Sequence, residues 1–218
     1  MPHIWVVILS FSILPAAVIC AARYNTMLRT YYPFAYLTWL SLVNEVISVF
    51  STAYSGSNAV NNNLYILAEW LLVVWLMHNW FMKRKRKIFY IITGALLALV
   101  WLADTFFIGS IHRFNSIFRI CYSLAIAFMA IDQFNALIVM GRHRLATNAR
   151  FLICCGLIFY FVYKAILEVL FMLDLSDSAH FQRIIFQAMA YINVICNLIY
   201  TIASLCIPTK QRFTLPYL

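Results

Sequence analysis

The sequence predicts an all-α protein, a polytopic bundle of seven transmembrane helices, and three observations support this. Of the 218 residues, 65% are hydrophobic and only 11% are charged, whereas soluble domains carry about 25% charged residues. The apolar residues form seven runs of roughly the 20 residues that a helix needs to cross a bilayer. Lys and Arg are concentrated between these runs. The composition therefore excludes a soluble, disordered or disulfide-stapled secreted domain.

Short connections join the seven runs, so we expect a single domain over residues 1–218. The expected spans are residues 4–22, 33–54, 62–82, 87–109, 115–140, 150–173 and 183–207. The first run has no basic residues before it, so we interpret it as a true span rather than a signal peptide. The run of asparagines at 61–63 is expected to begin the third span. The tail after Pro208 is too short to fold alone.

The distribution of positive charge predicts the orientation. Twelve of the sixteen Lys and Arg residues lie in the first, third and fifth connections or after the last span, and three lie on the other side. Positively charged loops stay in the cytoplasm. We therefore expect the N-terminus outside and the C-terminus in the cytoplasm, in a bacterial plasma (inner) membrane.

One connection carries a dense basic run that could suggest nucleic-acid binding. Its members are Lys83, Arg84, Lys85, Arg86 and Lys87. Spans lie directly on both sides of it, so we expect contacts with the anionic lipid leaflet and no nucleic-acid partner.

Polar residues inside the spans predict a shared interior face. In the second span Ser41, Asn44, Glu45, Ser48 and Thr52 recur at helical spacing and form one stripe. Similar stripes occur in the third, fifth, sixth and seventh spans. Charged groups in a bilayer are costly and normally face the bundle interior or water. We therefore expect these stripes to enclose a polar cavity in the outer half of the membrane.

The candidate ligand or ion pathway consists of the polar groups expected at this depth. They are Glu45, Glu69, Asp104, Arg119, Lys164, Glu168, Asn193 and Asn197. Lys164 and Glu168 are four residues apart and can pair along one helix face. The set contains more acids than bases, so some carboxylates are expected to lack a basic partner.

Cofactor chemistry is not expected. The six cysteines all fall within or at the ends of apolar spans, and the five histidines show no metal-ligand spacing. We predict no metal site, no catalytic residues and no cofactor. The seventh span contains no lysine that could carry retinal as a Schiff base, and the one lysine inside a span, Lys164, lies in the sixth. A retinal pigment is therefore not expected.

Four segments resemble a group of small seven-helix integral membrane proteins of the Bacteroidota. They are NNNLYILAEW at 61–70, FNSIFR at 114–119, LIFYF at 157–161 and NVICNLIY at 193–200. The resemblance implies a compact bundle with a sensory role. It marks Glu69, Arg119, Asn193 and Asn197 as the matched positions.

Three classes of function remain open. A sensor or receptor would bind a small ligand or a proton in an outward-facing pocket and signal to a cytoplasmic partner. A small proton-coupled transporter or ion channel would use the intramembrane carboxylates as its pathway, although no internal repeat supports it. An enzyme acting on lipid would need a nucleophile–base pair or a metal, and neither pattern is present. We favour the sensor.

Overall fold

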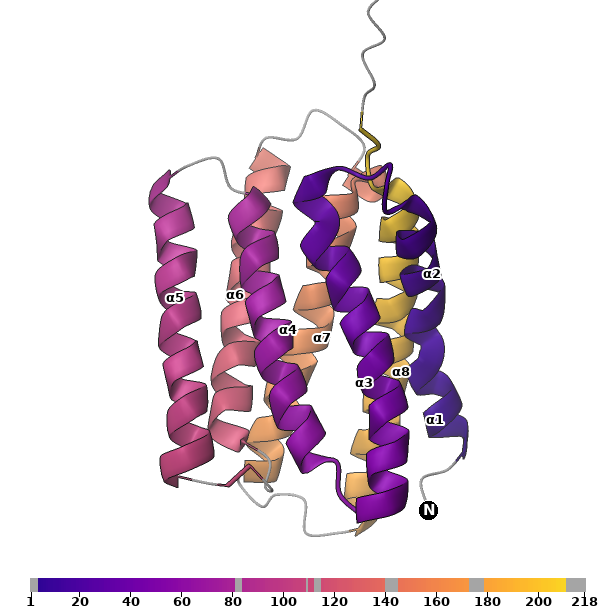
Figure 1. Cartoon of the computed structure of the whole chain (residues 1–218), viewed down its shortest axis with the longest axis vertical. Helices are drawn as coiled ribbons and strands as arrows, with labels where there is room; N and C mark the ends of the chain where they lie inside the picture. The colour runs from indigo at the N-terminus through magenta and orange to yellow at the C-terminus, as the bar shows by residue number, and fades with distance from the viewer. Residues whose placement is uncertain are drawn as a thin grey trace, which may run out of the picture.

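The computed structural model describes residues 4–80, 84–108, 110–111, 115–139, 145–172 and 179–210, and they form a helical bundle (Figure 1). The elements are α1 (Ile4–Ser10), η1 (Phe11–Ile13), α2 (Leu14–Arg23), η2 (Arg29–Tyr31), α3 (Tyr32–Ser55), α4 (Ala59–Trp80), α5 (Arg84–Ala103), the π-helical turn η3 (Asp104–Ile108), α6 (Ser116–Val139), η4 (Leu145–Thr147), α7 (Ala149–Met172) and α8 (Ala179–Cys206).

Within these ranges, six helices are long and apolar enough to cross a membrane. They cover Arg29–Ser55, Ala59–Trp80, Lys87–Phe107, Ser116–Val139, Ala149–Met172 and Gln187–Cys206. The helical class is thus confirmed, and six of the expected spans coincide with helices of this length and composition. Large hydrophobic side chains such as Phe50, Phe89, Phe128 and Leu205 point outward. Such a surface suits lipid rather than water, and it is compatible with a multi-pass membrane protein.

The first expected span, residues 4–22, is a broken helix instead of a continuous one. A 3-10 turn, η1, separates α1 from α2, and the apolar helix Val7–Arg23 is shorter than the other six. Pro15 is the second residue of α2, just after the turn. Its ring lacks an N–H and clashes with the carbonyl four residues earlier, so a regular α-helix cannot continue through this point.

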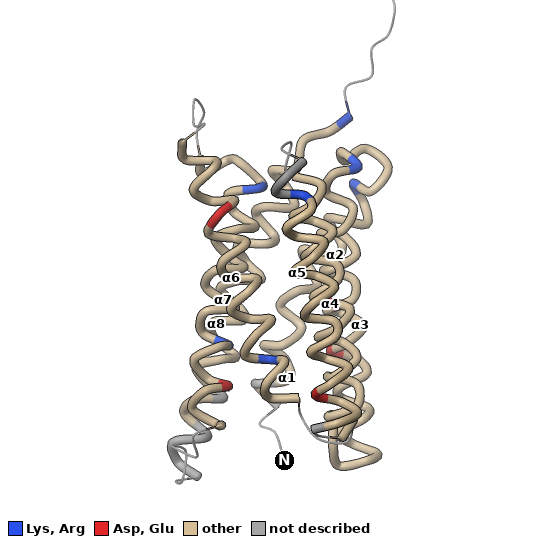
Figure 2. The backbone as a smooth tube through the Cα atoms, turned by 90° about the vertical axis from the view of Figure 1, so that its left-hand side faces the viewer, with Lys and Arg blue, Asp and Glu red and all other residues tan. Residues whose placement is uncertain are grey.

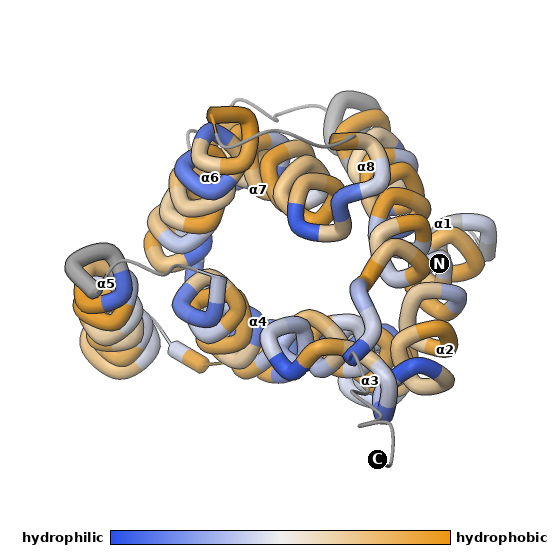
Figure 3. The backbone as a smooth tube through the Cα atoms, turned by 90° about the horizontal axis from the view of Figure 1, so that it is seen from above, coloured by the Kyte–Doolittle hydropathy of each residue, from blue (hydrophilic) through white to orange (hydrophobic). Residues whose placement is uncertain are grey.

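The helices are arranged as a ring with one helix outside it. Seen from above, α3, α4, α6, α7 and α8 surround the interior, the α1–α2 segment completes the ring between α3 and α8, and α5 lies outside against α4 and α6 (Figure 3). The cavity side chains can therefore come from the five long ring helices and from the inner face of the α1–α2 segment.

Charged residues divide between the two ends of the bundle. Most of the described Lys and Arg residues gather at the end opposite the N-terminus, whereas most of the described acids lie in the other half (Figure 2). We call the first the cationic end, defined by Arg23, Arg29, Arg150 and Lys210, and the other the N-terminal end. Of the expected lipid-contacting run, Lys83 lies outside the described residues, and the side chains of Arg84 to Arg86 are not described.

At the cationic end the first and last helices are joined by a polar clamp. The guanidinium of Arg23 donates to the carbonyls of Ser204 (2.7 Å) and Ile207 (2.8 Å), and also to that of Leu205. The last carbonyls of a helix have no partners within it, and a cation there also complements the helix dipole. Beside the clamp, Met27 and Thr209 form a short antiparallel bridge. The ring is thereby closed.

We predict that Arg23→Met destabilises the bundle by about 2 kcal/mol, because it leaves several carbonyls without a charged donor. Unfolding in detergent is measured as the temperature at which buried cysteines such as Cys154 react with a thiol-specific dye. Arg29→Met is the matched control, since it removes a nearby exposed arginine and should leave the melting temperature unchanged. Equal melting of the two variants would contradict the clamp.

Candidate functional site

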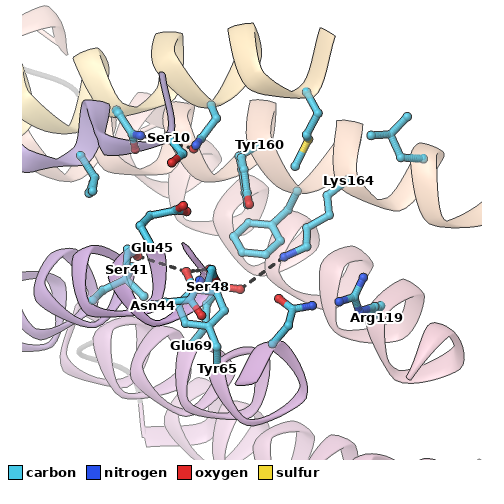
Figure 4. A pocket seen from close by; sticks show the side chains of 18 of the residues that line it. Ser10, Ser41, Asn44, Glu45, Ser48, Tyr65, Glu69, Arg119, Tyr160 and Lys164 are labelled. Atoms are coloured by element: carbon cyan, nitrogen blue, oxygen red, sulfur yellow. Dashed lines mark hydrogen bonds and ion pairs between the residues drawn. The ribbon is translucent and has the colours of Figure 1, made fainter. Parts of the chain in front are cut away.

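The ring of helices encloses a cavity of about 850 Å³. Its lining comes from α1, η1, α3, the α3–α4 connection, α4, α6, α7 and α8, and several of its side chains are shown in Figure 4. Along α3 the lining extends from Phe34 to Thr52, a distance of about 27 Å at helical rise. The volume falls within the range of roughly 300–1,000 Å³ that is typical of sites for small organic molecules.

The two ends of the cavity differ in polarity. Toward the cationic end it is lined by Phe34, Leu37 and Leu157, which are buried in the packed core. Toward the N-terminal end it reaches Thr52, which is exposed, and Asn58 in the connection between α3 and α4. The cavity therefore has an apolar floor, and its polar part lies near the N-terminal end.

The polar stripe expected on the second span lies on α3 and faces the cavity. Ser41, Asn44, Glu45, Ser48 and Thr52 all line it. Hydrogen bonds tie the stripe to α4 and its preceding connection. Those made by amide side chains are Asn61 to Asn44 (2.9 Å), Asn58 to Ser48 (2.8 Å) and Asn61 to Ser48 (3.2 Å).

Glu69 on α4 is the centre of the charged network. Tyr65 donates to one carboxylate oxygen at 2.7 Å, and Tyr122 on α6 donates to the other at 3.0 Å. The ammonium of Lys164 on α7 lies 3.6 Å from the same oxygen as Tyr122 (Figure 4). Ser41 on α3 bonds to the Tyr65 hydroxyl at 3.1 Å. One carboxylate thus connects four helices.

Lys164 also sits among aromatic rings. Its ammonium is 5.1, 5.3 and 5.5 Å from the ring centres of Tyr122, Tyr160 and Phe161. A cation near an aromatic face is attracted by the ring quadrupole. The rings and Glu69 together hold this lysine in place in the interior.

A second ion pair joins α6 to α7, with Arg119 and Glu168 only 2.7 Å apart. This differs from the expectation that Lys164 pairs with Glu168 along one face of α7. Each of the two residues instead reaches a different helix, Lys164 to Glu69 on α4 and Glu168 to Arg119 on α6. Pairs between helices neutralise both charges of the α7 face and also fix the helix positions.

Glu45 differs from the other two acids of the cavity lining. No described cation lies within ion-pair distance of its carboxylate. It lies between Ser41 of its own helix and Ser10 of α1 (Figure 4). Among the described residues, the lining therefore contains three carboxylates and two cations, and both cations are already paired.

Asp104 lies apart from the other candidate residues. It is buried in the turn after α5, where it accepts a hydrogen bond from the backbone N–H of Phe118 at 3.0 Å, in the first turn of α6. A carboxylate in this position caps a helix N-terminus. The cavity lining does not include Asp104. The next residue, Thr105, accepts a hydrogen bond from the side-chain amide of Asn115 at 2.6 Å, which ties the same turn to the start of α6.

The remaining candidates line the α8 side of the cavity. Asn197 donates to Ser12 at 2.8 Å and to Asn193 at 3.3 Å. The structure thus assembles seven of the eight candidates around one cavity. Sequence reasoning did not include Tyr65, Tyr122 or Ser10 among them. The spacing of Tyr65 and Glu69, one helical turn apart, was available as a signal, but nothing in the apolar first segment marks Ser10.

No described group of three or more His, Cys, Asp or Glu residues could hold a metal ion. The six cysteines, all in described segments, are free thiols. No family model, curated protein or solved structure matches the chain. Conclusions about function must therefore come from the cavity itself.

We predict that the Glu69–Lys164 pair is energetically coupled. Glu69→Gln and Lys164→Met each leave a partner charge in the interior without its counterion, whereas the double variant removes both charges. The double variant should therefore be more stable than the sum of the single effects by about 1–3 kcal/mol. The measurement is a double-mutant cycle of unfolding free energies in detergent. Additive effects would show that the two groups do not interact.

Gly156 on α7 allows the close approach of α8. A Cβ atom there would overlap the ring of Tyr200, which lines the cavity and packs edge-on against Phe34. We predict that Gly156→Ala lowers the unfolding free energy by about 1–3 kcal/mol, because the ring must move. Gly94→Ala is the control, since its nearest neighbour would be the side-chain methyl of Val74 at 3.1 Å. A loss no greater than that of the control would contradict the close approach.

Proposed function

We propose that this protein is a sensor or receptor of the bacterial plasma membrane, whose cavity binds a small ligand and whose helices relay the event to a cytoplasmic partner. The observation that carries the proposal is the cavity of about 850 Å³ with a polar, charged lining and an apolar floor. A site closed on one side suits binding and release from the same side.

The orientation follows from the charge distribution and is part of the proposal. Lys and Arg gather at the cationic end (Figure 2), and positive charge remains in the cytoplasm. The polar part of the cavity would then face the outside, while the cationic end would contact anionic lipid and a signalling partner. The network around Glu69 links four helices, so a ligand that displaces one of its members would shift several helices together.

The second candidate is a small proton-coupled transporter or ion channel. Its support is Glu45, a carboxylate in the cavity with no described cation beside it. Such a group could accept and release a proton. Against this candidate, the floor of Phe34, Leu37 and Leu157 interrupts the polar path toward the cationic end.

Proton flux in liposomes separates the two candidates. The purified protein is reconstituted with a trapped pH dye, and a potassium diffusion potential is imposed. We expect the same pH trace as in empty liposomes, for the wild type and for Glu45→Gln, Glu69→Gln and Lys164→Met. Flux above empty liposomes that Glu45→Gln abolishes would overturn the sensor and favour the transporter or channel. Melting with the thiol dye verifies that each reconstituted variant is folded.

A further inference from the structure

The charge of the cavity points to the class of its ligand, and this inference rests on the proposed function. Of the five charged side chains in the described lining, Glu69 and Lys164 form one pair and Arg119 and Glu168 form another. Glu45 is left over. We propose that the cavity binds an amphipathic organic amine carrying one positive charge, with the carboxylate of Glu45 as its counterion.

The surroundings of Glu45 suit an ammonium group. Ser41, Asn44 and Ser48 lie within one helical turn of it on the same face of α3, and Ser10 lies across from it (Figure 4). Asn44 and Ser48 already accept hydrogen bonds from Asn61 and Asn58. Ser10, however, donates its hydroxyl hydrogen to the carbonyl of Val7, which leaves its oxygen as an acceptor. An ammonium group offers only donors. A carboxylate with a further acceptor across from it therefore matches a cation better than it matches an anion.

The existing ion pairs limit the ligand to one net charge. A carboxylate group on the ligand would need a cation, but Arg119 and Lys164 are each held by an acid at 2.7 and 3.6 Å. A second ammonium group would likewise need a second unpaired acid, and the described lining offers only Glu45. A simple monoamine satisfies the site without breaking either pair.

The apolar floor provides for the rest of the molecule. Leu37 lies two turns of α3 from Glu45, about 12 Å along the helix, and Phe34 and Leu157 lie beside it on the floor. The space between Glu45 and the floor is much longer than the diameter of a metal ion and can hold the carbon skeleton of an organic molecule. An amine with its head at Glu45 would place an aromatic or aliphatic group against this floor, where it would be removed from water.

Three probes of similar shape and different charge test the inference on the full-length protein in detergent. Phenethylamine is a cation, phenethyl alcohol is neutral and hydrocinnamate is an anion. We expect phenethylamine, in the millimolar range, to raise the melting temperature of the wild type, because a ligand that binds only the folded state stabilises it. The alcohol and the carboxylate should have little effect.

Glu45→Gln should weaken binding of phenethylamine about 10- to 100-fold, the effect of losing a charged hydrogen bond. Asp132→Asn is the matched control, because it removes a carboxylate outside the cavity that bonds to Tyr90 at 2.8 Å, and it should bind the amine like the wild type. The comparison of probes on the wild type requires no variant, so the test does not depend on the folding of Glu45→Gln.

Three results would overturn the inference. The first is no stabilisation by phenethylamine in the millimolar range, and the second is equal binding of the amine by wild type and Glu45→Gln. The third is stronger stabilisation by the alcohol or the carboxylate, which would assign the cavity to a neutral or anionic ligand and leave the proposed receptor intact. Proton flux in liposomes would overturn the receptor instead, so the two failures are distinguishable.

Discussion

Hydrocarbon does not solvate charge, and this constraint organises the whole bundle. A carboxylate or ammonium group that faced lipid would cost several kcal/mol, and Glu45, Glu69, Arg119, Lys164 and Glu168 of α3, α4, α6 and α7 all turn toward one interior. There they are satisfied by each other and by phenol hydroxyls, above all around Glu69. These groups fix the rotation of each helix about its own axis. The apolar side chains of the outer surface do so only weakly, because they can face lipid equally well in several orientations.

The sequence was informative about which face of each helix points inward. Helical spacing placed Glu45 on the interior stripe of α3, and apolar length predicted six of the spans to within a few residues. It was less informative about neighbours. Spacing within α7 suggested that Lys164 meets Glu168, yet both residues reach across to other helices. Which helices adjoin is a property of the packed ring, and no pattern within one helix encodes it.

Asp104 is a second residue whose neighbours in the fold could not be predicted from the pattern within its own helix. The depth and charge of Asp104 resemble those of the cavity acids. However, Asp104 follows α5, which lies outside the ring, and the carboxylate of Asp104 caps α6 instead. A carboxylate can either cap a helix or bind a ligand, so only its position in the fold shows which of the two roles it has. The π-helical turn that carries Asp104 ends α5 and presents the carboxylate to the next helix. This acid stabilises the wall of the cavity without being part of it.

The clamp between Arg23 and the end of α8 has a consequence for biosynthesis. Its partners are more than 180 residues apart in the chain, and proteins are made from the N-terminus. Until α8 is synthesised, the wall of the cavity that carries Asn193 and Asn197 is missing, and the carbonyls that Arg23 will bind do not yet exist. The cavity is therefore the last part of the molecule to form, and a chain truncated before α8 would leave Glu45 and its neighbours open to the bilayer or to another membrane helix.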